Sequence, residues 1–269
     1  LQGVELIAGA TNLTLMGLNM RDGIRLTGRG SRATSTKILG REMVATDTLS
    51  LRLAKPTDFT FEPGQAIRLT IPAGTPDAAG EARVLSIASA PHEADITVIT
   101  RLRDSSVFKQ ALKSMPYGAE LQIAGPLGNF TQDEDRERPT VFLAGGIGIT
   151  PFLSMIRDAD HTGQLAKTSL FYSNRTPADS AMLKKLQDLD AANSGFQLVA
   201  TMSDVADRKD WSGETGWIDE DMLRRHLEDL TGRIYYCVGP AAFVSAMADV
   251  LTKAGVKKDD IRLEQFSGY

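Results

Sequence analysis

Cysteine is nearly absent from this sequence, which excludes much of the chemistry that thiols support. Cys237 is the only cysteine among the 269 residues. One thiol cannot form a disulfide within the chain, and it cannot hold an iron–sulfur cluster of the kind that needs four thiolates. Any electrons exchanged with such a cluster must therefore pass to or from another polypeptide, or a segment outside this sequence.

The sequence also has few histidines, a small net charge and few long apolar runs. The three histidines, His92, His161 and His226, lack the spacing of a metal site or of a Ser–His–Asp triad, so we expect no metal. A net charge of −4 gives no electrostatic case for nucleic acid as a partner. Residues 6–20 are apolar but too short and too polar to span a membrane. We therefore expect a globular protein that is long enough for two domains.

The first 33 residues are left without an assigned role. Arginines at four positions between residues 21 and 32, with Ser and Thr nearby, faintly resemble the end of an organelle-targeting segment. We favour an N-terminal extension that packs on the first domain. Because the sequence starts with Leu1, we expect the native start to lie elsewhere, and a longer parent protein stays open. The cytoplasm is the expected location, with an organelle as the alternative.

Residues 34–131 alternate short β-rich runs with turn residues. The pattern predicts strands at residues 36–43, 48–53, 66–71, 83–86, 95–100 and 120–124. Ser106 is a typical N-cap residue, and the spacing of Phe108, Leu112 and Met115 predicts one helix after it. So many short strands in so short a segment predict a six-stranded antiparallel β-barrel over residues 34–131.

A polar linker at residues 132–138 precedes an alternation of strands and helices that begins at Pro139. Strands are expected at residues 141–144, 169–173, 196–202, 234–238 and 261–264. Helices are expected from Pro151 onward and at residues 178–191, 219–230 and 241–254. This alternation predicts a doubly wound parallel sheet over residues 139–269, so the fold class is a two-domain β plus α/β protein.

The most informative stretch is residues 141–152, V-F-L-A-G-G-I-G-I-T-P-F. An apolar strand stops at a glycine turn that opens a helix, where free N–H groups and the helix dipole can face a diphosphate. Gly145, Gly146, Gly148 and Thr150 are the candidates for that contact, and Pro151 suits the first helical turn. The alternative is a turn that uses glycine for structural reasons alone.

A barrel followed by a domain with this turn resembles the ferredoxin–NADP reductase family over about residues 34–269. Five motifs similar to the family's occur in the expected order: P-G-Q at 63–65, R-V-L-S-I-A-S at 83–89, G-P-L-G-N-F at 125–130, G-P at 239–240 and E-Q-F at 264–266. The resemblance implies an FAD-binding barrel at residues 34–131 and an NAD(P)-binding α/β domain at residues 139–269.

The resemblance assigns residues 83–86 and Ser106 to FAD. A guanidinium can bind a diphosphate with two hydrogen bonds, so Arg83 is expected to hold that group. Ser86 is expected to hydrogen-bond the flavin N5 edge and to help pass a proton. Val84 and Leu85 complete the segment, with Leu85 where the family usually has a tyrosine that stacks on the ring. Ser106 fits a second phosphate contact. The alternatives are that Arg83 and Ser86 are ordinary strand residues and that Ser106 is a helix N-cap, none of them with a ligand.

The strand that ends F-Y-S-N-R brings Ser173 and Arg175 to the expected position of the adenosine ribose. A serine and an arginine suit the 2′-phosphate of NADPH, whereas an acid would favour NADH. NADPH is therefore the favoured co-substrate. The alternatives are that NADH is the co-substrate and that Arg175 is a solvated surface residue. Cys237 lies one residue before the position where many family members carry a cysteine, here Val238, so its side chain is expected to face the opposite side and fill the core.

The C-terminal E-Q-F motif supplies the remaining candidates. The resemblance implies that Glu264 relays protons or orients the nicotinamide, and that Phe266 covers the outer flavin face and moves for hydride transfer. Tyr269 is the second candidate for that ring. The alternative for both aromatics is to anchor the last strand. Ser86, Glu264 and Phe266 are thus the candidate catalytic residues.

These assignments predict an FAD-dependent oxidoreductase. It would transfer hydride between NAD(P)H and FAD and pass single electrons to a separate ferredoxin, flavodoxin or other small redox protein. One alternative is a reductase component or module that feeds an oxygenase or a haem protein. Another is an electron-transfer subunit that holds FAD without dehydrogenase activity of its own.

Overall fold

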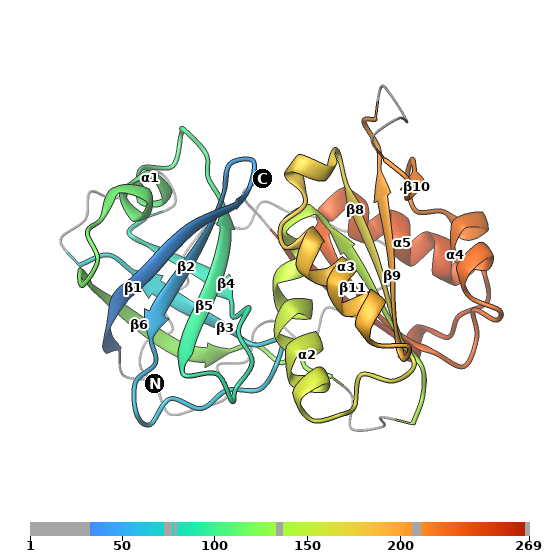
Figure 1. Cartoon of the computed structure of the whole chain (residues 1–269), viewed down its shortest axis with the longest axis horizontal. Coiled ribbons are helices and arrows are strands. Elements are labelled where there is room, and N and C mark those ends of the chain that lie inside the picture. The colour runs from blue at the N-terminus through green and yellow to red at the C-terminus, as the bar shows by residue number, and fades with distance from the viewer. Residues whose placement is uncertain (1–32, 73–76, 78–79, 133–136, 206–210, 267–269) are drawn as a thin grey trace, which may run out of the picture.

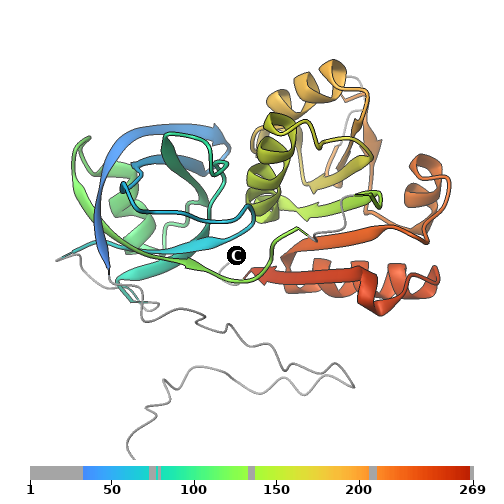
Figure 2. The same ribbon diagram turned by 90° about the horizontal axis from the view of Figure 1, so that it is seen from below.

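A computed structural model describes residues 33–72, 77, 80–132, 137–205 and 211–266. The expected N-terminal extension, apart from its last residue, and Tyr269 lie outside the described residues. Two sheets, each with its own helices, lie side by side (Figures 1 and 2). Within the described ranges, none of the helices combines the length and hydropathy needed to cross a bilayer.

The first sheet is the expected antiparallel barrel. Its strands pair in the order β4-β3-β6-β1-β2-β5, and a bridge between Ile87 and Val98 joins the two ends of the sheet. Alternate residues such as Ile67 and Leu69 point into one core, as the twofold period of a strand requires. The strands are β1 (Thr34–Ala45), β2 (Thr48–Ala54), β3 (Ala66–Thr70), β4 (Ala82–Ser86), β5 (Asp95–Arg101) and β6 (Glu120–Leu127).

Helix α1 (Val107–Ser114) forms where the sequence predicts it. The Ser106 hydroxyl accepts a hydrogen bond from the Lys109 amide at 3.3 Å, which caps the first turn. Phe108 and Leu112, one turn apart, bury their side chains in the barrel core. The helix is thereby fixed with its N-terminus beside β4.

The second sheet is parallel, with the strand order β10-β9-β8-β7-β11-β12. Its strands are β7 (Thr140–Gly145), β8 (Thr168–Asn174), β9 (Phe196–Met202), β10 (Glu214–Thr215), β11 (Ile234–Pro240) and β12 (Ile261–Phe266). Its helices are α2 (Ile149–His161), α3 (Leu183–Ala192), α4 (Glu220–His226) and α5 (Ala241–Lys253). The doubly wound fold predicted from the sequence is confirmed.

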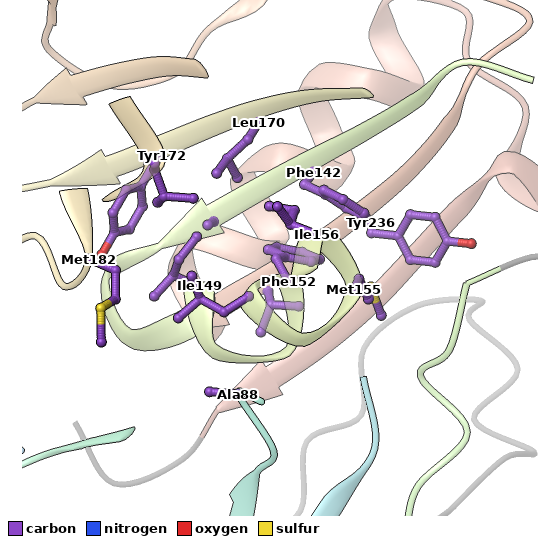
Figure 3. Close-up of a cluster of buried hydrophobic side chains, with 14 of the residues drawn as sticks. Ala88, Phe142, Ile149, Phe152, Met155, Ile156, Leu170, Tyr172, Met182 and Tyr236 are labelled. Atoms are coloured by element: carbon purple, nitrogen blue, oxygen red, sulfur yellow. The ribbon is translucent and has the colours of Figure 1, made fainter. Parts of the chain in front are cut away.

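Successive residues of the central strands enter two different cores. Phe142 and Tyr236 pack with α2 on one face (Figure 3), whereas Val141 and Tyr235 pack with α4 and α5 on the other. Because both faces are covered, these strands are apolar throughout rather than alternating. Cys237 belongs to the second core and is fully buried, as expected.

Two helices differ from their expected bounds. Helix α3 begins at Leu183 rather than near residue 178, because a 3₁₀ turn at Pro177–Asp179 and a left-handed Met182 precede it. Helix α4 ends at His226 rather than at residue 230. Leu227 and Leu230 are buried, so the apolar spacing that suggested a longer helix reflects burial in a non-helical segment. The two-residue β10 was not predicted.

Several of the motif residues join the two sheets rather than line a cavity. The ring of Phe130 packs against Phe152 and, edge to face, against Tyr236. A side chain at Gly64 would come within 2.1 Å of the Phe130 carbonyl oxygen, so only glycine fits there. The barrel therefore sits directly against α2 and β11, and this contact determines what faces the space between them.

Candidate functional site

A cavity of about 370 Å³ lies between the barrel and the parallel sheet. β4, β5 and α1 form one wall, and the glycine turn and β12 form the other. Seven of the residues expected from the sequence line it: Arg83, Val84, Leu85, Ser86, Thr150, Glu264 and Phe266. Residues from three distant parts of the chain are thus brought together around one space, which we call the barrel cavity.

A second cavity, of about 240 Å³, opens at the carboxyl ends of the parallel strands. Its lining includes four further expected residues: Gly145, Gly146, Ser173 and Arg175. We call it the sheet-edge cavity, and its position is where open α/β sheets bind ligands. Arg101 and Ile147 line both cavities, so the two spaces adjoin at these residues.

The glycine turn serves both the fold and the cavity. It follows β7 as a short 3₁₀ helix at Gly146–Gly148 that leads into α2. A Cβ at Gly148 would lie 2.2 Å from the Val238 carbonyl oxygen, and one at Gly145 would lie 2.8 Å from the Phe243 ring. Gly146 has φ of +56° and nothing within 4 Å of its missing Cβ. Glycine is therefore required by packing at two positions and leaves an open approach at the third.

Arg83 is engaged in an ion pair that the sequence did not suggest. Its guanidinium binds the carboxylate of Asp77, and both side chains are largely buried, at 16% and 7% exposure. The same carboxylate accepts hydrogen bonds from the Ser106 hydroxyl at 2.9 Å and from the Phe108 amide at 3.3 Å. Burial and the neighbouring Arg83 lower the pKa of Lys109, which also lines the barrel cavity. This corner of the barrel therefore gathers positive charge and hydrogen-bond donors around one carboxylate.

Glu264 is the unusual titratable group of the barrel cavity. It pairs in register with Val238 on β11, which holds it beside the glycine turn. Burial raises the pKa of its carboxyl to about 7 from the usual 4.5, and among the described residues its Oε2 has no hydrogen-bond partner. A buried acid poised near neutral pH can hold or release a proton under ordinary conditions.

The end of β8 presents three neighbouring side chains in different ways. Ser173 is buried, whereas Arg175 is 79% exposed and its Nη2 lies 3.6 Å from Oδ2 of Asp204. Between them, Asn174 is buried with neither amide atom bonded to any described residue. An orphaned amide at a cavity wall is costly unless a ligand or water satisfies it.

Trp217 is a site residue that sequence reasoning missed. It follows β10, lines the sheet-edge cavity and is 74% exposed. An exposed indole ring at a cavity wall offers a flat apolar face on which a ligand can stack. Nothing local signals this, because a turn residue such as Trp217 has no periodicity to show whether it is buried.

Not every expected residue lines a cavity. Ser106 does not line the barrel cavity but is hydrogen-bonded to Arg83 and Asp77 beside it. Gly148, the last glycine of the turn, packs against β11. Cys237 faces α4 and α5, and burial raises the pKa of its thiol. Tyr269 lies outside the described residues, so Phe266 is the C-terminal aromatic of the cavity that the structure describes.

The barrel cavity fits FAD on its own chemistry. Arg83 and the N-terminus of α1 already bind one carboxylate with the groups that a diphosphate needs. Leu85 and Ile99 supply apolar wall, and Ser86 and Glu264 supply polar groups. Cationic and polar groups beside an apolar wall match a cofactor that joins a diphosphate to a flat ring system.

Comparisons with known proteins agree with this arrangement. Residues 142–249 match the family model of the oxidoreductase NAD-binding domain. The chain is 28% identical over 263 residues to the reductase component of propane 2-monooxygenase from Rhodococcus jostii. The aligned region covers 96% of this chain and 70% of that protein.

Two solved structures share the fold over most of the chain. The FAD/NAD-binding domain of nitric oxide dioxygenase from Vibrio cholerae has a TM-score of 0.76 at 19% identity, covering 88% of this chain and 99% of that one. A ferredoxin NADP⁺ reductase from Neisseria gonorrhoeae with bound FAD and NADP has a TM-score of 0.73 at 20% identity, covering 87% and 98%. These matches show the two-domain fold of the ferredoxin–NADP reductase type, with an oxidoreductase NAD-binding domain at residues 142–249.

Proposed function

We propose that this protein is an NAD(P)H-dependent FAD reductase that delivers electrons to a separate redox protein of an oxygenase system. The observation that carries the proposal is the adjoining pair of cavities, which share Arg101 and Ile147. One cavity has a site for a diphosphate beside a buried acid, and the other lies at the ligand-binding edge of a parallel sheet. Two nucleotides bound there would meet at the shared wall.

In the barrel cavity the proposed roles follow from the contacts. Arg83, Ser106 and the N-terminal amides of α1 hold the FAD diphosphate, while Val84 and Leu85 pack along the cofactor. The cofactor itself, when bound, accepts hydride from a nicotinamide nucleotide and passes electrons on singly. Ser86 and Glu264 would hold or move a proton beside it, and the Phe266 ring, which also lines the cavity, would cover the outer flavin face and move for hydride transfer.

In the sheet-edge cavity the glycine turn binds the diphosphate of the nicotinamide nucleotide. Gly146 leaves the approach open, and α2, whose N-terminus carries the positive end of the helix dipole, begins close by at Ile149. Trp217 offers an exposed ring on which adenine can stack, and the amide of Asn174 hydrogen-bonds the ribose side. Arg175 binds the 2′-phosphate of NADPH once it leaves Asp204, an exchange that costs little because the pair is exposed.

The electron acceptor is the finer part of the proposal. The similarity to a propane 2-monooxygenase reductase component favours an oxygenase system, with a separate ferredoxin or flavodoxin as the second candidate. The chain has one cysteine, so a cluster-bearing carrier would be another polypeptide or segment.

Anaerobic stopped-flow mixing with NADPH and NADH, in parallel, tests the proposal. A yellow protein that both nucleotides bleach, NADPH faster, is the expected result. A protein without flavin absorbance would disprove the FAD assignment. A yellow protein that neither nucleotide bleaches would be an FAD-holding carrier subunit, a role that Leu85, in place of a stacking aromatic, would suit.

A further inference from the structure

We propose that Asp77 occupies the diphosphate position of the FAD site in the cofactor-free chain and so sets how tightly FAD binds. The inference rests on the proposed function, because it takes the barrel cavity to be the FAD site. It concerns the loop between β3 and β4, where Asp77 is itself described.

Three donors from described residues converge on the Asp77 carboxylate. The Arg83 guanidinium binds Oδ1, while the Ser106 hydroxyl and the Phe108 amide donate to Oδ2 at 2.9 and 3.3 Å. These are an arginine, a hydroxyl and a helix N-terminal amide, which is the donor set that proteins use for a phosphate group. A side-chain carboxylate has the charge and the planar two-oxygen edge to take the same donors.

Asp77 and a diphosphate cannot share this corner. The carboxylate is only 7% exposed, so its charge is poorly screened by water. Two anions on the same three donors would repel each other and would leave lone pairs unsatisfied. FAD must therefore exchange places with Asp77 at Arg83, and part of its gross binding free energy is used to break the existing contacts.

The positive charge near Arg83 favours FAD over Asp77 in this exchange. Lys109 lines the same cavity, and its ammonium is disfavoured there by burial and by the nearby Arg83. A diphosphate carries more negative charge than one carboxylate and so satisfies Arg83 and Lys109 together, whereas Asp77 satisfies mainly Arg83. FAD can therefore win the exchange, but with lower affinity than a neutral residue 77 would allow.

The test compares flavin binding to the full chain and to Asp77→Asn. FAD is released by dilution and rebound by titration, both followed by flavin fluorescence, with riboflavin as a probe that lacks the diphosphate. Asp77→Asn should bind FAD at least about tenfold more tightly, the size of one lost charge-assisted contact, and its affinity for riboflavin should equal that of the unaltered chain. Asp77→Ala is the second variant, and circular dichroism verifies that both are folded.

Asp104→Asn is the matched control, because it removes one charge near the same helix end. Its carboxylate is exposed and accepts a hydrogen bond from Gln110 rather than facing Arg83. This control should leave FAD affinity within about twofold, as expected for a screened surface charge.

Unchanged or weaker FAD binding by the Asp77 variants would overturn the inference and would make Asp77 a residue that positions Arg83 for the cofactor. Equal tightening for riboflavin would also overturn it, because riboflavin has no diphosphate to compete. If neither the unaltered chain nor the Asp77 variants bound flavin, the proposed function itself would be wrong. If all of them bound FAD equally tightly, only the inference about Asp77 would be wrong.

Discussion

The Ser154 hydroxyl donates a hydrogen bond of 2.7 Å to the carbonyl oxygen of Ser89, and both residues are fully buried. Ser154 lies in α2 and Ser89 follows β4, so this bond crosses from the parallel sheet's layer to the barrel. The Ser89 hydroxyl in turn accepts the Thr97 amide at 2.9 Å. The last serine of the R-V-L-S-I-A-S motif therefore holds the two halves of the site at a fixed separation.

Ser154→Ala is expected to lower the free energy of unfolding by about 1–2 kcal/mol, because it leaves a buried carbonyl without this donor. Urea unfolding of both proteins measures the difference. Ser114→Ala, at an exposed position of α1, is the control and should change stability by less than about 0.5 kcal/mol. A loss no larger than that of the control would mean that the Ser89 carbonyl finds another donor.

Glu264→Gln is expected to stabilise the flavin-free chain above neutral pH. The folded-state pKa is about 7 against 4.5 in the reference state, so between these values the folded chain binds more protons than the unfolded chain. The free energy of unfolding therefore falls as pH rises through that window, by up to about 3 kcal/mol. The variant should not show this loss.

Thermal unfolding at pH 5 and pH 8 checks the prediction. The gain from Glu264→Gln should be present at pH 8 and nearly absent at pH 5, where the wild-type carboxyl is protonated. Glu62→Gln, at an exposed position, is the control and should behave alike at both pH values. A gain of equal size at both would point to packing rather than to proton binding.

Trp217→Ala is expected to raise KM for the nicotinamide nucleotide about tenfold with little change in kcat. Stacking of adenine on an exposed ring contributes about 1–3 kcal/mol, and it contributes equally before and during hydride transfer. Steady-state kinetics with ferricyanide as acceptor measures both constants. Trp217→Phe should retain most of the affinity, and Tyr117→Ala, an exposed aromatic on the barrel, should have no effect. A fall in kcat alone would contradict the adenine role.

Arg175→Gln is expected to lower kcat/KM for NADPH about tenfold and to leave NADH nearly unchanged, because only NADPH has a 2′-phosphate for the guanidinium. Asp204→Asn should act in the opposite direction, since it removes the carboxylate that lies 3.6 Å from Arg175. The ratio of kcat/KM for the two nucleotides is the measurement. Equal losses for both in Arg175→Gln would show that the arginine does not read the phosphate.

Local pattern was sufficient for most of the fold. Short β-rich runs between turn residues marked the strands of the barrel, and the apolar run before Gly145 marked a buried strand, which the structure covers on both faces. The pattern was wrong where buried residues have helical spacing but lie outside a helix. Leu227 and Leu230 are buried at such a spacing, although α4 ends at His226. The left-handed Met182 also delayed the start of a predicted helix to Leu183, because nothing in its residue type announces that conformation.

The candidate site divides in the same way. Residues within short motifs, such as Arg83, Ser86 and Glu264, were identified from their order along the chain. Their partners were not, because Asp77 reaches Arg83 through a loop and Asp204 reaches Arg175 from a different strand end. Which side chains meet across such distances depends on how the elements pack.

Sequence alone thus predicted the two sheets, the glycine turn and the resemblance to the ferredoxin–NADP reductase family, because each depends on residues close together in the chain. Cys237, the only cysteine of the sequence, likewise excluded a disulfide within the chain and a cluster held by four of its own thiolates. Tertiary packing decided the rest: the adjoining cavities at Arg101 and Ile147, the buried proton of Glu264, and the anion already seated on Arg83. Burial and charge pairing are properties of neighbours in space, and those neighbours come from β4, α1 and β12 only once the barrel has packed against the parallel sheet.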